Sequence, residues 1–186
     1  GLRVPGAFDG YELAVRAVLG QQVSVKAATT IAGRLVTAFG EPIETPHEGL
    51  THLTPTPARI AAASTDEIAS LGVVQTRARS IMALAQEIEA GRLLLDPGAS
   101  PEATVAELQS LPGIGAWTAH YVAMRALRWP DAFPKEDLIV RKRLGGVTPA
   151  RAEAMAEAWR PWRAYATLYL WGAEGCKGGL RPPAEG

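Results

Sequence analysis

A turn with two glycines is the part of this sequence whose residue types and spacing most directly suggest a chemical role. It reads LPGIG over residues 111–115 and lies between two segments with helical periodicity, Thr104–Ser110 and Ala116–Arg128. Such a hairpin turns several backbone N–H groups outward at the positive end of the second helix, an arrangement that binds phosphate. An ordinary corner between helices is the alternative interpretation, and the immediate start of the second helix favours phosphate binding.

A carboxylate, Asp137, follows this turn in the segment FPKEDL. An aspartate directly before an apolar and basic helix is a good N-cap, which is the purely structural interpretation. The two roles are compatible, because a cap holds its carboxylate in place. A phosphate-binding turn followed by a fixed carboxylate predicts chemistry on nucleic acid.

Aromatic and amide side chains could complete such a site. Trp117 and Tyr121 are four residues apart and share one helix face, and Trp171 lies on the last predicted helix. Tryptophans at helical spacing are more often core residues, but an aromatic slot beside a carboxylate suits an electron-poor, cationic ring. Gln21 and Gln22 lie at the break between the first two predicted helices. Adjacent amides there are usually surface residues, and they could also enter a base stack.

The composition excludes several classes of site. Nineteen basic and nineteen acidic residues give zero net charge, so binding to nucleic acid would depend on local charge, as in the basic segment 138–163. The single Cys176 excludes an internal disulfide and a four-cysteine iron–sulfur or zinc site. The three histidines do not have metal-ligand spacing, and we expect His120 at the surface or at its edge. We expect a cytoplasmic protein, because no membrane-spanning run or signal peptide is visible.

Helical periodicity and capping residues predict an all-α protein of roughly ten helices, since no segment alternates with period two. The connector Glu41–Thr56 and the loop Trp129–Glu136 are predicted to be irregular, and Gly178–Gly186 is predicted to be a frayed tail. The predicted helices are Asp9–Leu19, Val23–Phe39, Thr56–Ala63, Ser64 to about Gly72, Thr76–Ala90, one that begins at Ser100-Pro101 and enters the hairpin, Ala116–Leu127, Leu138–Leu144, Ala150–Trp159 and Pro161–Glu174.

Several blocks of the sequence together resemble the helix-hairpin-helix DNA glycosylase superfamily, and within it the AlkA-type 3-methyladenine DNA glycosylase II branch. The blocks are LRVPG at the start, VRAVLGQQVSV over 15–25, the hairpin with WTAHY over 117–121, the loop into Asp137, and PWRAYA over 161–166 through Trp171. The resemblance implies a two-lobed helical bundle with a cleft between the lobes. It implies one catalytic domain over 1–186, with one lobe at about 21–128 and the other at about 1–20 plus 129–186.

The resemblance also implies a role for each part of the site. Asp137 would be catalytic, and Trp117, Tyr121 and Trp171 would form the base pocket. Gln22 would be the wedge that fills the gap left by the extruded base. The DNA-binding residues would be Gln21, Gln22, Pro112, Gly113, Ile114, Gly115 and Thr118. No cofactor is required, and the backbone carbonyls of Gln109, Leu111 and Ile114 would hold a structural Na⁺ or K⁺.

The function implied is hydrolysis of the N-glycosidic bond of alkylated purines in duplex DNA by base flipping, by a monomer associated with a bacterial nucleoid. Trp117 replaces the lysine of bifunctional relatives, so the enzyme is expected to be monofunctional. Gln22 is polar where the AlkA branch has an apolar wedge. Two alternatives stay open at this point: a non-catalytic helix-hairpin-helix module that binds DNA, and a glycosylase for deaminated or oxidised bases.

Overall fold

The structure is a computed structural model that describes residues 1–172, and within them it contains ten α-helices and no strand, which confirms the all-α prediction. The helices are α1 (Gly10–Leu19), α2 (Val25–Phe39), α3 (Pro57–Ala61), α4 (Thr65–Ala69), α5 (Gln75–Glu89), α6 (Pro101–Ser110), α7 (Ala116–Arg125), α8 (Leu138–Arg143), α9 (Pro149–Ala156) and α10 (Arg163–Gly172), and a 3₁₀ turn (Glu157–Trp159) follows α9. The predicted end of the last helix, Cys176 and the predicted tail lie outside the described residues.

Local capping chemistry sets most helix starts. The Ser64 hydroxyl accepts from the Glu67 N–H while the Glu67 carboxylate accepts from the Ser64 N–H, so the predicted capping box is present at α4. Thr56 and Thr148 cap α3 and α9, each followed by a proline in the first turn. α7 ends at Arg125, earlier than predicted. The chain turns out of the helix there, and Arg128 has a left-handed φ of 57°.

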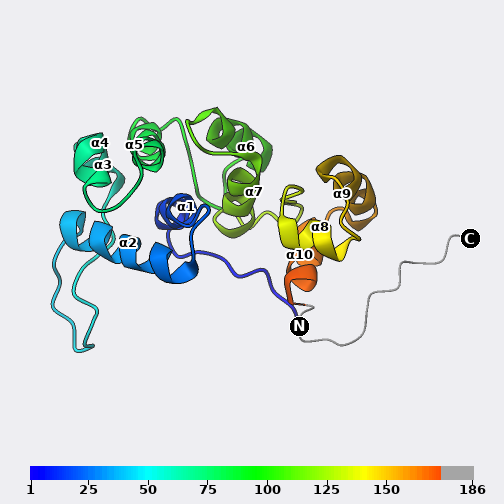
Figure 1. Ribbon diagram of the computed structural model, residues 1–186, viewed down its shortest axis with the longest axis horizontal. Coiled ribbons are helices and arrows are strands. Elements are labelled where there is room, and N and C mark those ends of the chain that lie inside the picture. Colours follow the sequence, from blue (N-terminus) through cyan, green and yellow to red (C-terminus); the bar gives the residue numbers. More distant parts are fainter. Residues whose placement is uncertain (173–186) are drawn as a thin grey trace, which may run out of the picture.

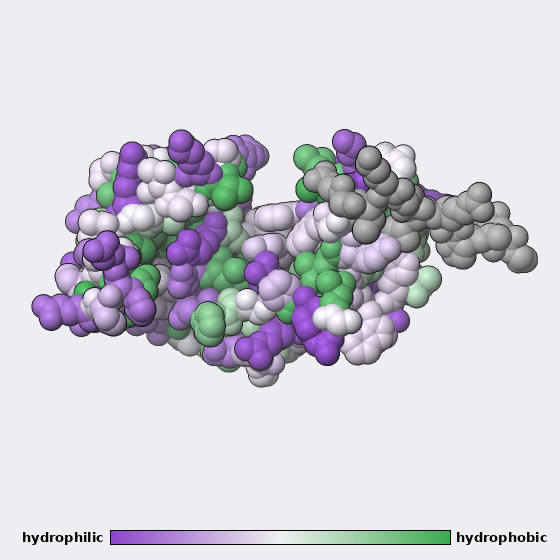
Figure 2. Space-filling view, turned by 90° about the horizontal axis from the view of Figure 1, so that it is seen from below, coloured by the Kyte–Doolittle hydropathy of each residue, from purple (hydrophilic) through white to green (hydrophobic). Residues whose placement is uncertain are grey.

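Two groups of helices form the two lobes (Figure 1). In the first lobe, α1 to α7 enclose a core in which Val18, Ile81 and Val122 are fully buried. The second lobe, α8 to α10, has a smaller core that includes Phe133 and Val140. Figure 2 shows a hollow between the two lobes.

The boundary between the lobes differs from the prediction at the start of the chain. α1 packs on α2, α5 and α7, and Tyr11 and Leu19 belong to the core of the first lobe. The assignment of residues up to about 20 to the second lobe is therefore wrong for α1, because its apolar stripe faces the first-lobe helices. Val4 instead packs against a third cluster, formed by Met124, Ala132 and Ala164, at the junction of the lobes.

An ion-pair network fixes the loop that leads into α8. The guanidinium of Arg163 donates to both carboxylate oxygens of Asp131, at 2.7 and 2.8 Å, and Arg160 also donates to Asp131. The Ala164 N–H donates to the Pro130 carbonyl at 2.9 Å. Burial acts to raise the pKa of Asp131, but Arg163 and Arg160 hold it below its ordinary value. The loop before α8 is thus fastened to the start of α10.

No helix in residues 1–172 is both long enough and apolar enough to span a bilayer.

Candidate functional site

Asp137 is the N-cap of α8, as the sequence predicts. Its Oδ1 accepts from the backbone N–H groups of Ile139 and Val140, each at 2.9 Å, and its own N–H donates to the Pro134 carbonyl at 2.9 Å. The residue is 7% exposed. The fold therefore fixes the position of this carboxylate through the backbone of the helix that it begins.

Two indole nitrogens also donate to the Asp137 carboxylate. Trp117 Nε1 lies 2.7 Å from Oδ2, and Trp171 Nε1 lies 3.2 Å from Oδ1. Trp117 is on α7 of the first lobe, whereas Trp171 is on α10 of the second. Four N–H donors thus converge on one carboxylate, and an ionised carboxylate can accept all of them. The two predicted pocket tryptophans are brought to the predicted catalytic residue, although their role as a base pocket stays a prediction.

Tyr121 lies in a stack along α7. Its ring is 5.2 Å from the Trp117 ring with an interplanar angle of 8°. One turn further on, the Arg125 guanidinium carbon lies 5.5 Å from the Tyr121 ring centroid, and Arg125 donates to the Tyr121 hydroxyl at 3.3 Å. Both contacts come from residues one turn away from Tyr121 on the same helix. Tyr121 thus lies beside the pocket tryptophan, and its role in a base pocket stays a prediction.

The hairpin has the predicted form. Gly113 has φ +76°, a conformation that favours glycine, and the Ile114 N–H donates to the Leu111 carbonyl at 3.2 Å. No side chain caps the start of α7 at Gly115. Within residues 1–172, the N–H groups of Gly113 and Gly115 have no hydrogen-bond acceptor. These N–H groups are available to a ligand such as a phosphate oxygen, and this contact stays a prediction.

Side chains from two other elements hold the hairpin from behind. The buried Ser80 hydroxyl on α5 lies 2.6 Å from the Pro112 carbonyl. The Gln21 amide nitrogen donates to the Gly113 carbonyl and to the Thr118 hydroxyl oxygen, each at 3.1 Å. Thr118 is 4% exposed, and its predicted role in DNA binding stays a prediction. Its hydroxyl is used inside the protein, as is the Gln21 amide nitrogen.

Gln22 has a different environment from its neighbour. It is exposed and has φ 53°, at the junction of α1 and α2. A surface hollow of about 290 Å³ lies beside this junction, and Val25 at its rim is 84% exposed. Tyr121 also lines the hollow, so the junction lies close to the aromatic stack. The wedge role of Gln22 stays a prediction that its exposure allows.

The carbonyls predicted to bind a monovalent cation lie at the end of α6 and in the hairpin. They belong to Gln109, Leu111 and Ile114. The Leu111 carbonyl already accepts from Ile114 within the hairpin, and a carbonyl oxygen has a second lone pair to offer. Terminal helix carbonyls and turn carbonyls suit a hard monovalent cation, so these residues fit the prediction. Within the described residues, no group of three or more His, Cys, Asp or Glu side chains could hold a metal ion.

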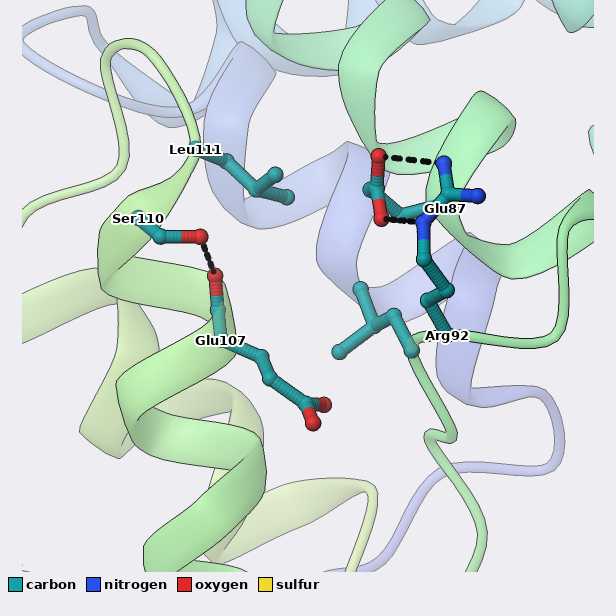
Figure 3. Close-up of a pocket in the computed structure, with 6 residues that line it drawn as sticks. Glu87, Arg92, Glu107, Ser110 and Leu111 are labelled. Atoms are coloured by element: carbon teal, nitrogen blue, oxygen red, sulfur yellow. Dashed lines mark hydrogen bonds and ion pairs between the residues drawn. The ribbon is translucent and has the colours of Figure 1, made fainter.

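A second hollow, of about 360 Å³, lies behind the hairpin between the ends of α5 and α6 (Figure 3). Arg92 and Glu87 form a bidentate ion pair there, at 2.6 and 2.8 Å, and Glu107 extends toward it. Two carboxylates and one guanidinium do not suit a phosphate. Leu111 is the one residue that this hollow shares with the predicted site.

His120 is partly buried and stacks on Trp129, with ring centroids 6.0 Å apart. Its Nδ1 is buried and has no partner in the described residues. Burial lowers the pKa of His120, and the positive charges of Arg163 and Lys135 lower it further, while Glu153 acts in the opposite direction. The expected edge position is therefore only partly correct.

The sequence and the fold are similar to those of DNA repair proteins. Residues 15–164 match the family described as HhH-GPD superfamily base excision DNA repair protein. The chain is 46% identical over 175 residues to the probable bifunctional transcriptional activator/DNA repair enzyme AlkA of Mycobacterium tuberculosis, across 92% of this chain and 35% of that protein. It is 39% identical over 175 residues to DNA-3-methyladenine glycosylase 2 of Escherichia coli, across 94% of this chain and 61% of that protein.

The solved structure of a 3-methyladenine DNA-glycosylase from Archaeoglobus fulgidus has a similar fold. The TM-score is 0.74 at 25% identity, with 91% of this chain and 59% of that one covered. The chain thus spans 35% and 61% of the length of the two curated relatives described above.

Proposed function

Because this chain belongs to the HhH-GPD superfamily of base excision DNA repair proteins, we propose that it removes alkylated purines of the 3-methyladenine type from duplex DNA by hydrolysing their N-glycosidic bonds. The observation that carries the proposal is the Asp137 carboxylate, which accepts from an indole nitrogen of each lobe. A carboxylate fixed beside aromatic rings suits a reaction at the sugar of an extruded nucleotide. The names of the E. coli and A. fulgidus relatives support alkylated bases as the substrate.

Extrusion of the damaged nucleotide is the first step of the proposed reaction. It costs a few kcal/mol, and less for a weakened pair. The unpaired N–H groups of the hairpin would hold the backbone beside the lesion, and Gln22 would occupy the gap in the stack. Stacking of the base on an aromatic ring, worth about 1–3 kcal/mol, offsets much of the cost. Trp117, Tyr121 and Trp171 would supply the ring surface.

Cleavage of the glycosidic bond is the second step. N-alkylation makes the purine cationic and a better leaving group, so the base needs little help from an acid. The sugar gains oxocarbenium character as the bond breaks, as it does in glycoside hydrolysis. Asp137 would stabilise that positive charge and orient or deprotonate the attacking water. The products would be a free base and an abasic site.

A lyase reaction through a Schiff base is not part of the proposal. The residue two positions after Gly115 is Trp117, which has no amine. The lysine nearest in sequence to Asp137 is Lys135, and its ammonium group donates to Glu153 at 2.6 Å. We therefore expect base release without strand cleavage.

The variant Asp137→Asn tests the proposal. Asparagine keeps an oxygen for the α8 N–H groups but removes the charge, so base release from 3-methyladenine or 7-methylguanine duplexes should fall about 10²–10³-fold or more. Affinity for an undamaged duplex should stay within about threefold, the effect of less than one hydrogen bond. Single-turnover base release and fluorescence anisotropy measure the two quantities.

Asp66→Asn is the matched control, because Asp66 lies on α4 and accepts from Gln75, away from the site. Full base release by Asp137→Asn would contradict the catalytic role. A wild-type protein that binds duplex DNA and releases no base from any alkylated substrate would support the non-catalytic module instead. Release of deaminated or oxidised bases alone would indicate the second alternative, a glycosylase for those bases.

A further inference from the structure

We propose that Gln21 is a positioning residue that couples the hairpin to the junction carrying Gln22, so that a single amide sets the geometry between the phosphate contact and the wedge. The inference rests on the proposed function, because it assigns a partner residue to the predicted wedge. Gln21 was expected to bind DNA, and the structure gives its amide nitrogen two acceptors within the protein.

Both hydrogens of the Gln21 amide are committed to the hairpin and the start of α7. The Gly113 carbonyl can only accept, so the nitrogen of the amide must face it. The second hydrogen goes to the hydroxyl oxygen of Thr118, which is buried. These contacts join residues 92 and 97 positions apart in the sequence. The amide therefore joins the α1–α2 junction to the hairpin and the start of α7, which are far from the junction in the sequence.

The chain geometry transmits this contact to Gln22. The Gln21 N–H donates to the Val18 carbonyl at 3.2 Å, so the backbone before the junction is held by α1. Gln22 follows in the left-handed region, at φ 53°, a conformation that a non-glycine residue adopts only at a cost. With Gln21 fastened on both its backbone and its side chain, Gln22 is exposed at a set distance from the hairpin.

Ser80 allows the coupling to be tested apart from the support of the hairpin. Its hydroxyl, on α5, donates to the carbonyls of Pro112 and Thr76, and neither of these lies in the α1–α2 junction. Loss of the Gln21 amide thus leaves the hairpin supported by Ser80. Loss of Ser80 leaves the junction tied to the hairpin by Gln21. The two residues support neighbouring carbonyls of one turn, and they differ in whether they reach the wedge.

The experiment compares Gln21→Met, Ser80→Ala and the control Gln75→Met, whose amide donates to Asp66 on the first lobe. The probe is a duplex with a tetrahydrofuran abasic analogue and an adjacent 2-aminopurine, whose fluorescence rises when the stack is opened. Anisotropy on an undamaged duplex gives the affinity. Thermal unfolding shows whether each variant folds.

Gln21→Met should lower the 2-aminopurine signal at saturating protein about fivefold, while the duplex affinity changes less than about twofold. Ser80→Ala should weaken duplex affinity about fivefold and leave the saturated signal intact. Gln75→Met should change neither quantity. An unchanged signal in Gln21→Met, or a parallel loss of signal and affinity in that variant, overturns the coupling.

A second pair of variants keeps the test decisive if Gln21→Met does not fold. Thr118→Val removes one acceptor of the amide, and Thr118→Ser keeps it. The valine variant should lose signal in the same direction as Gln21→Met, and the serine variant should match the wild type. Equal behaviour of the two Thr118 variants would overturn the coupling.

The coupling and the proposed function fail in different measurements. The 2-aminopurine signal requires binding and insertion but no bond cleavage. A wild-type protein that opens the stack and releases no alkylated base would remove the catalytic proposal, and the variant comparison would still decide the coupling.

Discussion

At the scale of single residues, the most specific feature is the convergence of four N–H donors on Asp137. Two of them come from the helix that Asp137 begins, and two come from indoles. The backbone donors position the carboxylate, as in any N-cap. The indoles add a requirement that an ordinary cap does not have, because Trp117 and Trp171 belong to different lobes. The tryptophans are therefore expected to hold the carboxylate as well as to face the base.

Trp117→Phe and Trp171→Phe test this second role. Each variant keeps an aromatic ring and loses the indole N–H. A hydrogen bond to a charged group is worth about 1.5–3 kcal/mol, so single-turnover base release should fall about tenfold to a hundredfold. Trp117→Phe should have the larger effect, because its contact is the shorter, 2.7 against 3.2 Å.

Trp162→Phe is the control for these two variants, since Trp162 is exposed and packs on Tyr165. It should release bases at the wild-type rate. A wild-type rate in Trp117→Phe and Trp171→Phe as well would limit the indoles to stacking.

At the scale of elements, the hairpin depends on its neighbours. A Cβ on Gly113 would lie 2.4 Å from the Ser80 hydroxyl oxygen, and the φ of +76° is itself unfavourable for other residues. A Cβ on Gly115 would meet no atom within 4 Å. The two glycines of the motif therefore carry different structural constraints, although the sequence pattern makes them look alike.

Gly113→Ala should lower the free energy of unfolding by about 1–3 kcal/mol, because either the backbone or Ser80 must shift. It should also weaken binding to damaged and undamaged duplexes alike. Denaturant unfolding and anisotropy measure the two effects. Gly115→Ala is the control for unfolding and should stay close to the wild type. Unchanged duplex affinity in Gly113→Ala would contradict the phosphate-binding role of the hairpin.

The elements also mark what the sequence could and could not predict. Asp137 as an N-cap and Gly113 in a turn were predictable, because their signals lie within a few neighbouring residues. The contacts of Gln21 with Gly113 and of Ser80 with Pro112 span 92 and 32 positions. No periodicity in the sequence indicates such contacts, so they could not be predicted from it. The apolar stripe of α1 predicted a buried face, but periodicity does not say which helices cover it. The lobe of α1 came instead from the family resemblance, and the packing of α1 on α2, α5 and α7 differs from it.

At the scale of the whole molecule, the environment of two titratable groups makes the free energy of unfolding depend on pH. The pKa of His120 is lowered by burial and by Arg163 and Lys135, so the folded state binds fewer protons than the unfolded state. Its contribution to stability is present above the unfolded value of about 6.5 and is lost as the pH falls. The pKa of Asp131 is also lowered, and its contribution is lost below its ordinary value, near pH 4.

The free energy of unfolding should therefore decrease between pH 7.5 and pH 5, and it should decrease less in His120→Gln, which has no imidazole to protonate. Urea unfolding at the two pH values measures the difference. His47→Gln, in the exposed connector, is the matched control. An equal decrease in the wild type and in His120→Gln would show that other groups govern this range. Below about pH 4, both proteins should lose stability through Asp131.

The pair of indoles on Asp137 has a mechanical consequence. Trp117 belongs to the α1–α7 lobe, whereas Trp171 and the Asp137 carboxylate that both indoles contact belong to the α8–α10 lobe. Any hinge motion that separates the two lobes must stretch the hydrogen bond from Trp117 to Asp137. The position of the Asp137 carboxylate thus depends on the alignment of the two lobes. DNA that forced the lobes apart would also break the hydrogen bond from Trp117 to this carboxylate.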